Sequence, residues 1–105
     1  MQLVVFCTAK NRGEAEYLSK LLLEKKLCAC VNISDSISSH FFWDNEVQSE
    51  SEAMMIIKTS SRVYDKVEIM IKEHHSYDVP EIIAMPIIKG SREYLDWIEE
   101  ETKDI

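Results

Sequence analysis

Two adjacent histidines, His74 and His75, begin the stretch in which reactive side chains are densest. An aromatic hydroxyl, Tyr77, follows within residues 74–88, which also contain two prolines. Imidazole nitrogens bind transition metals and exchange protons near neutral pH. Because proline disrupts a helix and has no backbone N–H to donate to a sheet, Pro80 predicts the point at which a helix ends and a strand follows. The histidine pair is therefore expected at a helix-to-strand junction.

A thiol far away in the sequence completes the first candidate site. Cys7 closes an apolar run at residues 3–7, and an antiparallel strand after the junction would start beside it. Cys7, His74 and His75 are therefore predicted to converge, and a thiolate with imidazoles suits copper or zinc better than magnesium or calcium. Neighbouring residues on a regular helix point about 100° apart, so both histidines can bind one metal only if the helix has already ended. The alternative is a buried, apolar Cys7 with two surface histidines.

Two other sets of residues are weaker candidates. Cys28 and Cys30 would share a strand face and offer two thiolates to a soft ion, but two ligands are too few and the core is the favoured environment. The second set would line a cleft between subunits, where an ammonium and a carboxylate fix a small anion or amide. It comprises Lys58, Tyr77, Glu81 and Trp43. The alternative for this set is an ion pair between subunits.

No arrangement for covalent catalysis is apparent. Serines and histidines occur, but neither a G-x-S-x-G nucleophile elbow nor a glycine-rich phosphate loop accompanies them. We therefore expect a protein that is not an enzyme.

Hydrophobic periodicity predicts the elements that must position these groups. The apolar run at residues 3–7 indicates a strand buried on both faces. Asn11 is placed to cap a helix that ends near Lys26. Serines are expected to cap the two later helices, Ser60 or Ser61 for the second and Ser91 for the last.

A period of two predicts a long hairpin. Its strands occupy residues 30–43 and 46–59, joined by a tight turn at Asp44 and Asn45. The alternation places five apolar residues on one face of the first of these strands: Val31, Ile33, Ile37, Phe41 and Trp43.

The predicted order of elements is β-α-β-β-α-β followed by a terminal helix. This is the α+β, ferredoxin-like split βαβ arrangement, in which the first strand lies between the third and the fourth. Residues 1–105 are expected to form one such domain.

Composition limits the possible partners and compartment. Twelve basic against nineteen acidic residues give a net charge of −7, which opposes binding to nucleic acid backbones. No apolar run is long enough to cross a bilayer, and no secretory leader is visible, so no membrane partner is expected. Three cysteines, an odd number, fit free thiols in a reducing compartment, and cytoplasm is the predicted location.

The length of the hairpin predicts an assembly. Each strand of fourteen residues would reach about 46 Å if straight, whereas a compact domain of this size is only about 33 Å across. The hairpin must therefore overshoot its own domain or bend sharply at a bulge. Its far end carries an aromatic cluster, Phe41, Phe42 and Trp43, that a stable monomer would not leave wet. We predict that the hairpin pairs with a neighbouring subunit, the alternative being that it curls over its own sheet.

Five segments resemble, in order and spacing, the CutA divalent-cation tolerance family over essentially the whole chain. They are residues 27–33 (LCACVNI), 43–47 (WDNEV), 56–59 (IIKT), 75–82 (HSYDVPEI) and 94–98 (YLDWI). The resemblance implies a ferredoxin-like homotrimer, similar in architecture to PII signalling proteins, with sheets joined between subunits. Four positions depart from the family's usual residues: Ser76 replaces proline, Asn45 glycine, Phe41 tyrosine and Cys28 alanine.

The resemblance also implies a function. The family is linked to metal tolerance and copper binding, and bacterial members with a similar Cys-Thr-Ala segment and His-His pair are described as copper binders at the positions of Cys7, His74 and His75. We therefore expect a homotrimeric divalent-cation tolerance protein that binds Cu2+ or another divalent or soft metal ion and no other cofactor. The alternative is a trimeric sensor or adaptor, similar to PII proteins, that binds a small molecule in the cleft between subunits.

Overall fold

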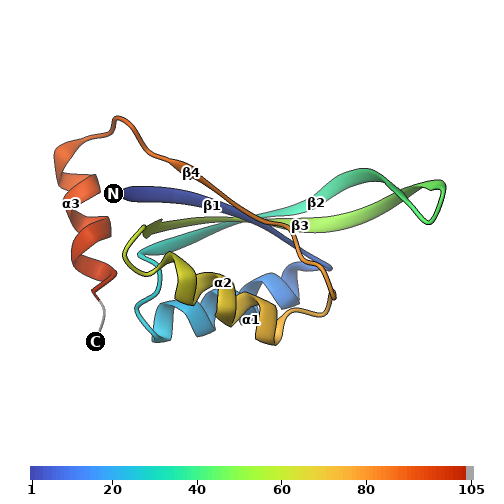
Figure 1. The fold of residues 1–105 in the computed structure, drawn as a ribbon, viewed down its shortest axis with the longest axis horizontal. Coiled ribbons are helices and arrows are strands. Elements are labelled where there is room, and N and C mark those ends of the chain that lie inside the picture. The colour runs from blue at the N-terminus through green and yellow to red at the C-terminus, as the bar shows by residue number, and fades with distance from the viewer. Residues whose placement is uncertain (104–105) are drawn as a thin grey trace.

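The computed structural model describes residues 1–103, which contain a four-stranded antiparallel sheet and three helices (Figure 1). The elements are, in chain order, β1 (Gln2–Ala9), α1 (Arg12–Glu24), β2 (Cys30–Trp43), β3 (Glu46–Ser60), α2 (Tyr64–His74), β4 (Ile82–Pro86) and α3 (Arg92–Glu101). The strand order is β2-β3-β1-β4, so β1 lies between β3 and β4. The predicted α+β class and ferredoxin-like order are confirmed.

Local signals in the sequence account for several element ends. The side chain of Asn11 accepts a hydrogen bond at 2.9 Å, and that of Ser91 one at 3.2 Å, each from the backbone N–H three residues further on. Both predicted helix caps are thus confirmed. Asp44 and Asn45 have φ values of 56° and 62°, the left-handed backbone that a tight hairpin turn requires.

The start of α2 differs from the prediction. Ser60 is the last residue of β3, and its hydroxyl accepts a hydrogen bond from the Thr102 hydroxyl at 3.0 Å. Ser61 accepts one from the amino group of Met1, also at 3.0 Å. The helix begins after Val63, which provides no side-chain cap. The two hydroxyls are used for contacts with distant parts of the chain, so the prediction that either caps α2 is wrong.

Helices α1 and α2 cover one face of the sheet, and the main core lies between them and the sheet (Figure 1). Alternate residues of β1 and β3 point into this core and are almost fully buried: Val5, Cys7, Ala53, Met55 and Ile57. In the part of the chain that the structure describes, the other face of the sheet has no matching layer, apart from contacts with α3 at one end through Gln2, Cys30 and Ser60.

We call that other side of the sheet the uncovered face. On β1 and β3 its apolar residues alternate with the core-facing ones, and on β4 they are the residues that pair with those of β1. They are Val4, Phe6, Met54, Ile56, Ile83 and Met85. Phe6 pairs with both Ile56 and Ile83, and Ile83 and Met85 are 54% and 48% exposed. A row of large, half-exposed apolar side chains on a sheet is typical of an interaction surface.

The β2–β3 hairpin reaches far beyond the helical layer and sets the longest dimension of the molecule, 44 Å (Figure 1). Its tip is apolar and exposed to solvent, since Phe42, Trp43 and Val47 are 69%, 63% and 76% exposed. The prediction that the hairpin overshoots its domain is therefore correct for the single chain.

A bulge between Ser34 and Ile37 interrupts the pairing of β2 with β3. Ile33 lies opposite Met55, whereas Ile37 lies opposite Glu52, three residues away along β3. Residues three apart on a strand point to opposite faces, so the two isoleucines do as well. The prediction of one continuous apolar face along β2 is wrong, because the extra residue in the bulge shifts the alternation.

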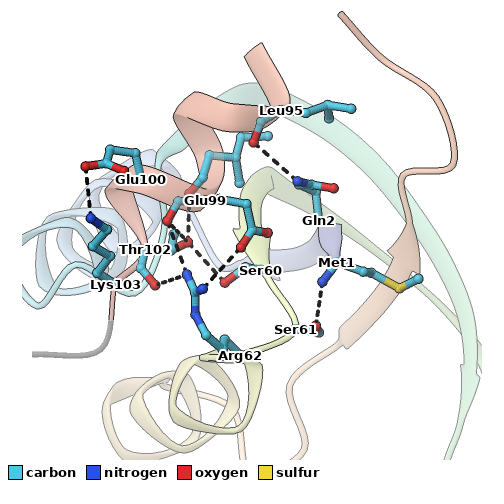
Figure 2. Close-up of polar contacts among 11 residues, drawn as sticks. Met1, Gln2, Ser60, Ser61, Arg62, Leu95, Glu99, Glu100, Thr102 and Lys103 are labelled. Atoms are coloured by element: carbon cyan, nitrogen blue, oxygen red, sulfur yellow. Dashed lines mark hydrogen bonds and ion pairs between the residues drawn. The ribbon is translucent and has the colours of Figure 1, made fainter. Parts of the chain in front are cut away.

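Hydrogen bonds and an ion pair of the Arg62 side chain hold helix α3 at the end of the sheet (Figure 2). Arg62 donates to the carbonyl oxygens of Glu99 and Thr102 at 3.2 and 3.1 Å, and its guanidinium lies 3.3 Å from the Glu99 carboxylate. Gln2 donates to the carbonyl oxygen of Leu95 at 3.3 Å. The last carbonyls of a helix have no partner within the helix, so Arg62 supplies what the end of α3 lacks.

Candidate functional site

His75 joins the end of α2 to the end of β1. It follows the last helical residue and has extended backbone, with φ −79° and ψ 146°. Its Nε2 donates to the carbonyl oxygen of Thr8 at 2.8 Å, and the N–H of Tyr77 donates to its Nδ1 at 3.0 Å. These two bonds define the tautomer, with the hydrogen on Nε2. Both ring nitrogens are therefore occupied in holding the junction against β1.

Cys7 and His75 both donate hydrogen bonds to the carbonyl oxygen of Thr8. The Cys7 thiol is fully buried and donates to the carbonyl oxygen of Thr8 at 3.6 Å. Burial, and then the nearby charges of Glu81, Glu14 and Glu52, raise the pKa of this thiol from 9.0 to about 12. The thiol is consequently protonated at neutral pH.

His74 points in a different direction from His75. Its Nδ1 lies 2.9 Å from the carbonyl oxygen of Met70, one turn earlier on α2, and its ring meets the ring of Tyr17 on α1 edge-on, with centroids 6.2 Å apart. α2 ends at His74. The helix thus ends between the two histidines, yet they still diverge.

The structure therefore brings together two of the three predicted metal ligands, Cys7 and His75, and leaves His74 apart. Within residues 1–103 no group of three His, Cys, Asp or Glu side chains is placed to hold a metal ion. In this conformation the donor set does not fit copper, since the thiol retains its proton and both nitrogens of His75 are occupied. The copper site stays a prediction.

The structure also brings together only some of the predicted cleft residues. Tyr77 and Glu81 line one cavity of about 410 Å³, together with Thr8, Phe41, Glu52 and Val79. Lys58 is elsewhere, on the uncovered face, where it donates to the side chain of Asn32. Trp43 is at the hairpin tip. A single chain does not assemble this set, so the cleft between subunits stays a prediction.

Glu52 is a site residue that the sequence reasoning missed. Period-two alternation assigns it to a polar strand face, as it does Glu50, yet Glu52 is only 8% exposed. The Tyr77 hydroxyl donates to its carboxylate at 2.7 Å. Burial and the Glu52 carboxylate together raise the pKa of Tyr77. The bulge in β2 lies opposite this part of β3 and gave no clear signal in the sequence.

The two other cysteines lie in different environments, although Cys30 adds to the effect of burial in raising the pKa of Cys28. Cys28 is 2% exposed and belongs to the main core. The sulfur of Cys30 lies 3.5 Å from the hydroxyl of Tyr94, on α3. The interpretation of this pair as core residues and not as a soft-ion site stays a prediction.

Buried thiols give a pH prediction. Burial raises the pKa of both Cys7 and Cys28 from 9.0 to about 12. The unfolded chain therefore releases two protons above about pH 9 that the folded chain keeps, and the unfolding free energy should fall as pH rises from there. Each thiol contributes a slope of up to about 1.4 kcal/mol per pH unit.

Urea unfolding at one protein concentration and a series of alkaline pH values measures this slope. Cys28→Ala should make it shallower, whereas Cys30→Ala, at a half-buried position, serves as the matched control. A slope that Cys28→Ala leaves unchanged would contradict the assignment.

Comparisons with known proteins agree in family and in fold. Residues 3–101 match the family model described as "CutA1 divalent ion tolerance protein". The chain is 46% identical over 96 residues to the divalent-cation tolerance protein CutA of Archaeoglobus fulgidus, an alignment that covers 91% of this chain and 93% of that protein. The solved structure of the divalent cation tolerance protein Cut A1 from Thermus thermophilus superposes with a TM-score of 0.96 at 40% identity, covering 98% of this chain and 100% of that one.

A plant relative bears on the compartment. The chloroplastic protein CutA of Arabidopsis thaliana is 40% identical over 97% of this chain, which spans only 56% of that protein. Relatives thus occur outside the cytoplasm, and the cytoplasmic location stays a prediction. Within residues 1–103, none of the helices is both long and apolar enough to span a membrane.

Proposed function

We propose a function from one premise: the chain belongs to the CutA1 divalent ion tolerance family. The proposed function is that of a homotrimeric, non-enzymatic protein of divalent-cation tolerance that binds a divalent or soft metal ion. Family membership carries the tolerance role. The trimer and the metal ion each need support from the residues of this chain.

The uncovered face supports the assembly. Helices cover the other face of the sheet, but Ile83 and Met85 remain about half exposed beside Phe6 and Ile56. Burying apolar surface is the main driving force of association. Identical subunits that place these faces against one another would remove this surface from water, and a closed ring would leave none of it exposed.

The hairpin supports the same conclusion. A long projecting strand pair exposes unpaired N–H and C=O groups along its edge, and natural proteins usually protect such edges. Here the projecting tip also exposes Phe42, Trp43 and Val47. A hairpin that lies along the next subunit would cover both the edge and the aromatic tip. The projecting hairpin with its exposed apolar tip is the observation that carries the proposed homotrimer.

The end of β1 is where we propose that the cation binds. Cys7 and His75 already share the carbonyl oxygen of Thr8. Glu81, Glu14 and Glu52 lie close enough to raise the pKa of the thiol, and the same negative field attracts a cation. Copper binding by Cys7, His74 and His75 stays the specific prediction. It would release the thiol proton and cost the two hydrogen bonds of His75, so the affinity should be lower than that of a preformed site.

Anaerobic copper titration of the folded protein tests this part of the proposal. Cys7→Ser should remove any thiolate-to-Cu(II) absorption, and both His74→Ala and His75→Ala should weaken binding. Cys30→Ser and His40→Ala, which change a thiol and an imidazole outside the predicted site, are the matched controls and should leave binding unchanged. If folded Cys7→Ser binds copper with the wild-type affinity and spectrum, the predicted site is wrong.

A further inference from the structure

Glu52, a buried carboxylate for which residues 1–103 show no ion pair, lines the cavity beside the junction and also a neighbouring cavity that contains Lys10 and Arg12. Glu52 is only 8% exposed, and the hydrogen bond that it accepts comes from a neutral group, the Tyr77 hydroxyl at 2.7 Å. A second carboxylate, that of Glu81, lines the same cavity. A charge removed from water is costly unless an opposite charge or several hydrogen bonds compensate it.

The rest of the lining does not supply the missing positive charge. Within residues 1–103 no lysine or arginine lines the cavity. His40 is the basic side chain present, and its Nε2 lies 3.1 Å from the hydroxyl of Ser38 on the exposed hairpin. The carboxylates also act on neighbouring groups. Burial and the charges of Glu81 and Glu52 raise the pKa of Cys7, and burial and Glu52 raise the pKa of Tyr77.

The cavity also has apolar walls. Phe41 and Val79 are among its lining residues, and its volume of about 410 Å³ is within the range of small-molecule sites. The face of an aromatic ring attracts organic cations, whose charge is spread and weakly hydrated. A metal ion would gain little from these walls, and residues 1–103 offer it no cluster of three ligands.

We propose that this cavity binds a small organic cation, a protonated amine or a guanidinium, whose N–H groups donate to Glu52 and Glu81 while its alkyl part contacts Phe41 and Val79. The carboxylates supply charge and hydrogen-bond acceptors, and the apolar walls select against a bare inorganic ion. This ligand class goes beyond the proposed divalent-cation role. The two proposals share the negative charges of Glu52 and Glu81, but the organic cation would use neither His74 nor the Cys7 thiol.

Calorimetric titration of the intact protein in buffer with a chelator tests the proposal. The probes are agmatine and butylammonium, and 1-butanol and butyrate serve as neutral and anionic controls of similar length. Saturable binding of at least one cationic probe, with none of either control, is the expected result. Because removing one charged hydrogen-bond partner usually costs more than 1.4 kcal/mol, Glu52→Gln should weaken binding about tenfold or more.

Two further variants make the test decisive. Glu81→Gln, at an exposed position, should also weaken binding and cannot act by unfolding the core. Glu46→Gln, on the same strand but at the hairpin turn, should leave the affinity unchanged. Absence of saturable binding by either cation, equal binding of 1-butanol, or affinities that neither Glu52→Gln nor Glu81→Gln alters would overturn the proposal. The chelator keeps these outcomes separate from the copper titration, so either result can fail alone.

Discussion

Ile57→Ala is expected to lower the unfolding free energy by about 2–5 kcal/mol, the usual loss when a large aliphatic side chain is removed from a packed core. Ile57 is fully buried on the inner strand β3, directly opposite Val5 of β1 and Val31 of β2. A strand that is hydrogen-bonded on both sides has little freedom to move into the cavity that the substitution leaves. Urea unfolding at one fixed protein concentration measures the loss.

Ile69→Ala is the matched control for this substitution. Ile69 lies on α2 and is 55% exposed, so its replacement should change the unfolding free energy by no more than about 0.5 kcal/mol. Equal effects of the two substitutions would show that the core is not where the structure locates it.

The second large effect is expected on assembly. Ile83→Lys puts a charge on the uncovered face, opposite Phe6, where the proposed subunits meet. The side chain is 54% exposed in the single chain, so a monomer should tolerate the lysine with little change in its stability. In the assembly the same ammonium would be buried without a partner, which is strongly unfavourable. We therefore expect the variant to dissociate at concentrations where the wild-type protein is associated.

Ile69→Lys separates this effect from a general loss of solubility or folding. Ile69 has nearly the same exposure, 55%, but lies on α2, the helical side of the molecule. Sedimentation velocity should show Ile83→Lys as a smaller particle and Ile69→Lys as the wild-type one. If the two variants sediment alike, the uncovered face is not the subunit interface.

The parts of the fold that follow from short-range rules could be predicted from the sequence. Asn11 and Ser91 cap helices because each has a free hydrogen-bonding side chain just before a helical apolar pattern. The chain order of strands and helices then leaves few topologies, and the ferredoxin-like one is correct. Ser60 and Ser61 carry the same local signal, but their partners are Thr102 and Met1, which no local rule identifies.

The candidate site shows the same division. Topology alone predicts that Cys7 lies near the junction, and Cys7 and His75 do share the carbonyl oxygen of Thr8. The direction of the His74 side chain depends on where α2 ends and on its contact with Tyr17, and sequence periodicity predicts neither. The burial of Glu52 depends on the bulge in the opposite strand and on the Tyr77 hydroxyl. Such long-range side-chain contacts require the folded structure.

The central claim is that this chain acts as a homotrimer whose uncovered faces and hairpins are buried between subunits. Light scattering coupled to size-exclusion chromatography at low micromolar concentration tests it most directly, because it gives the particle mass without reference to shape. The predicted result is a single species of three times the 12.2 kDa chain mass. A particle of 12.2 kDa under the same conditions would contradict the claim.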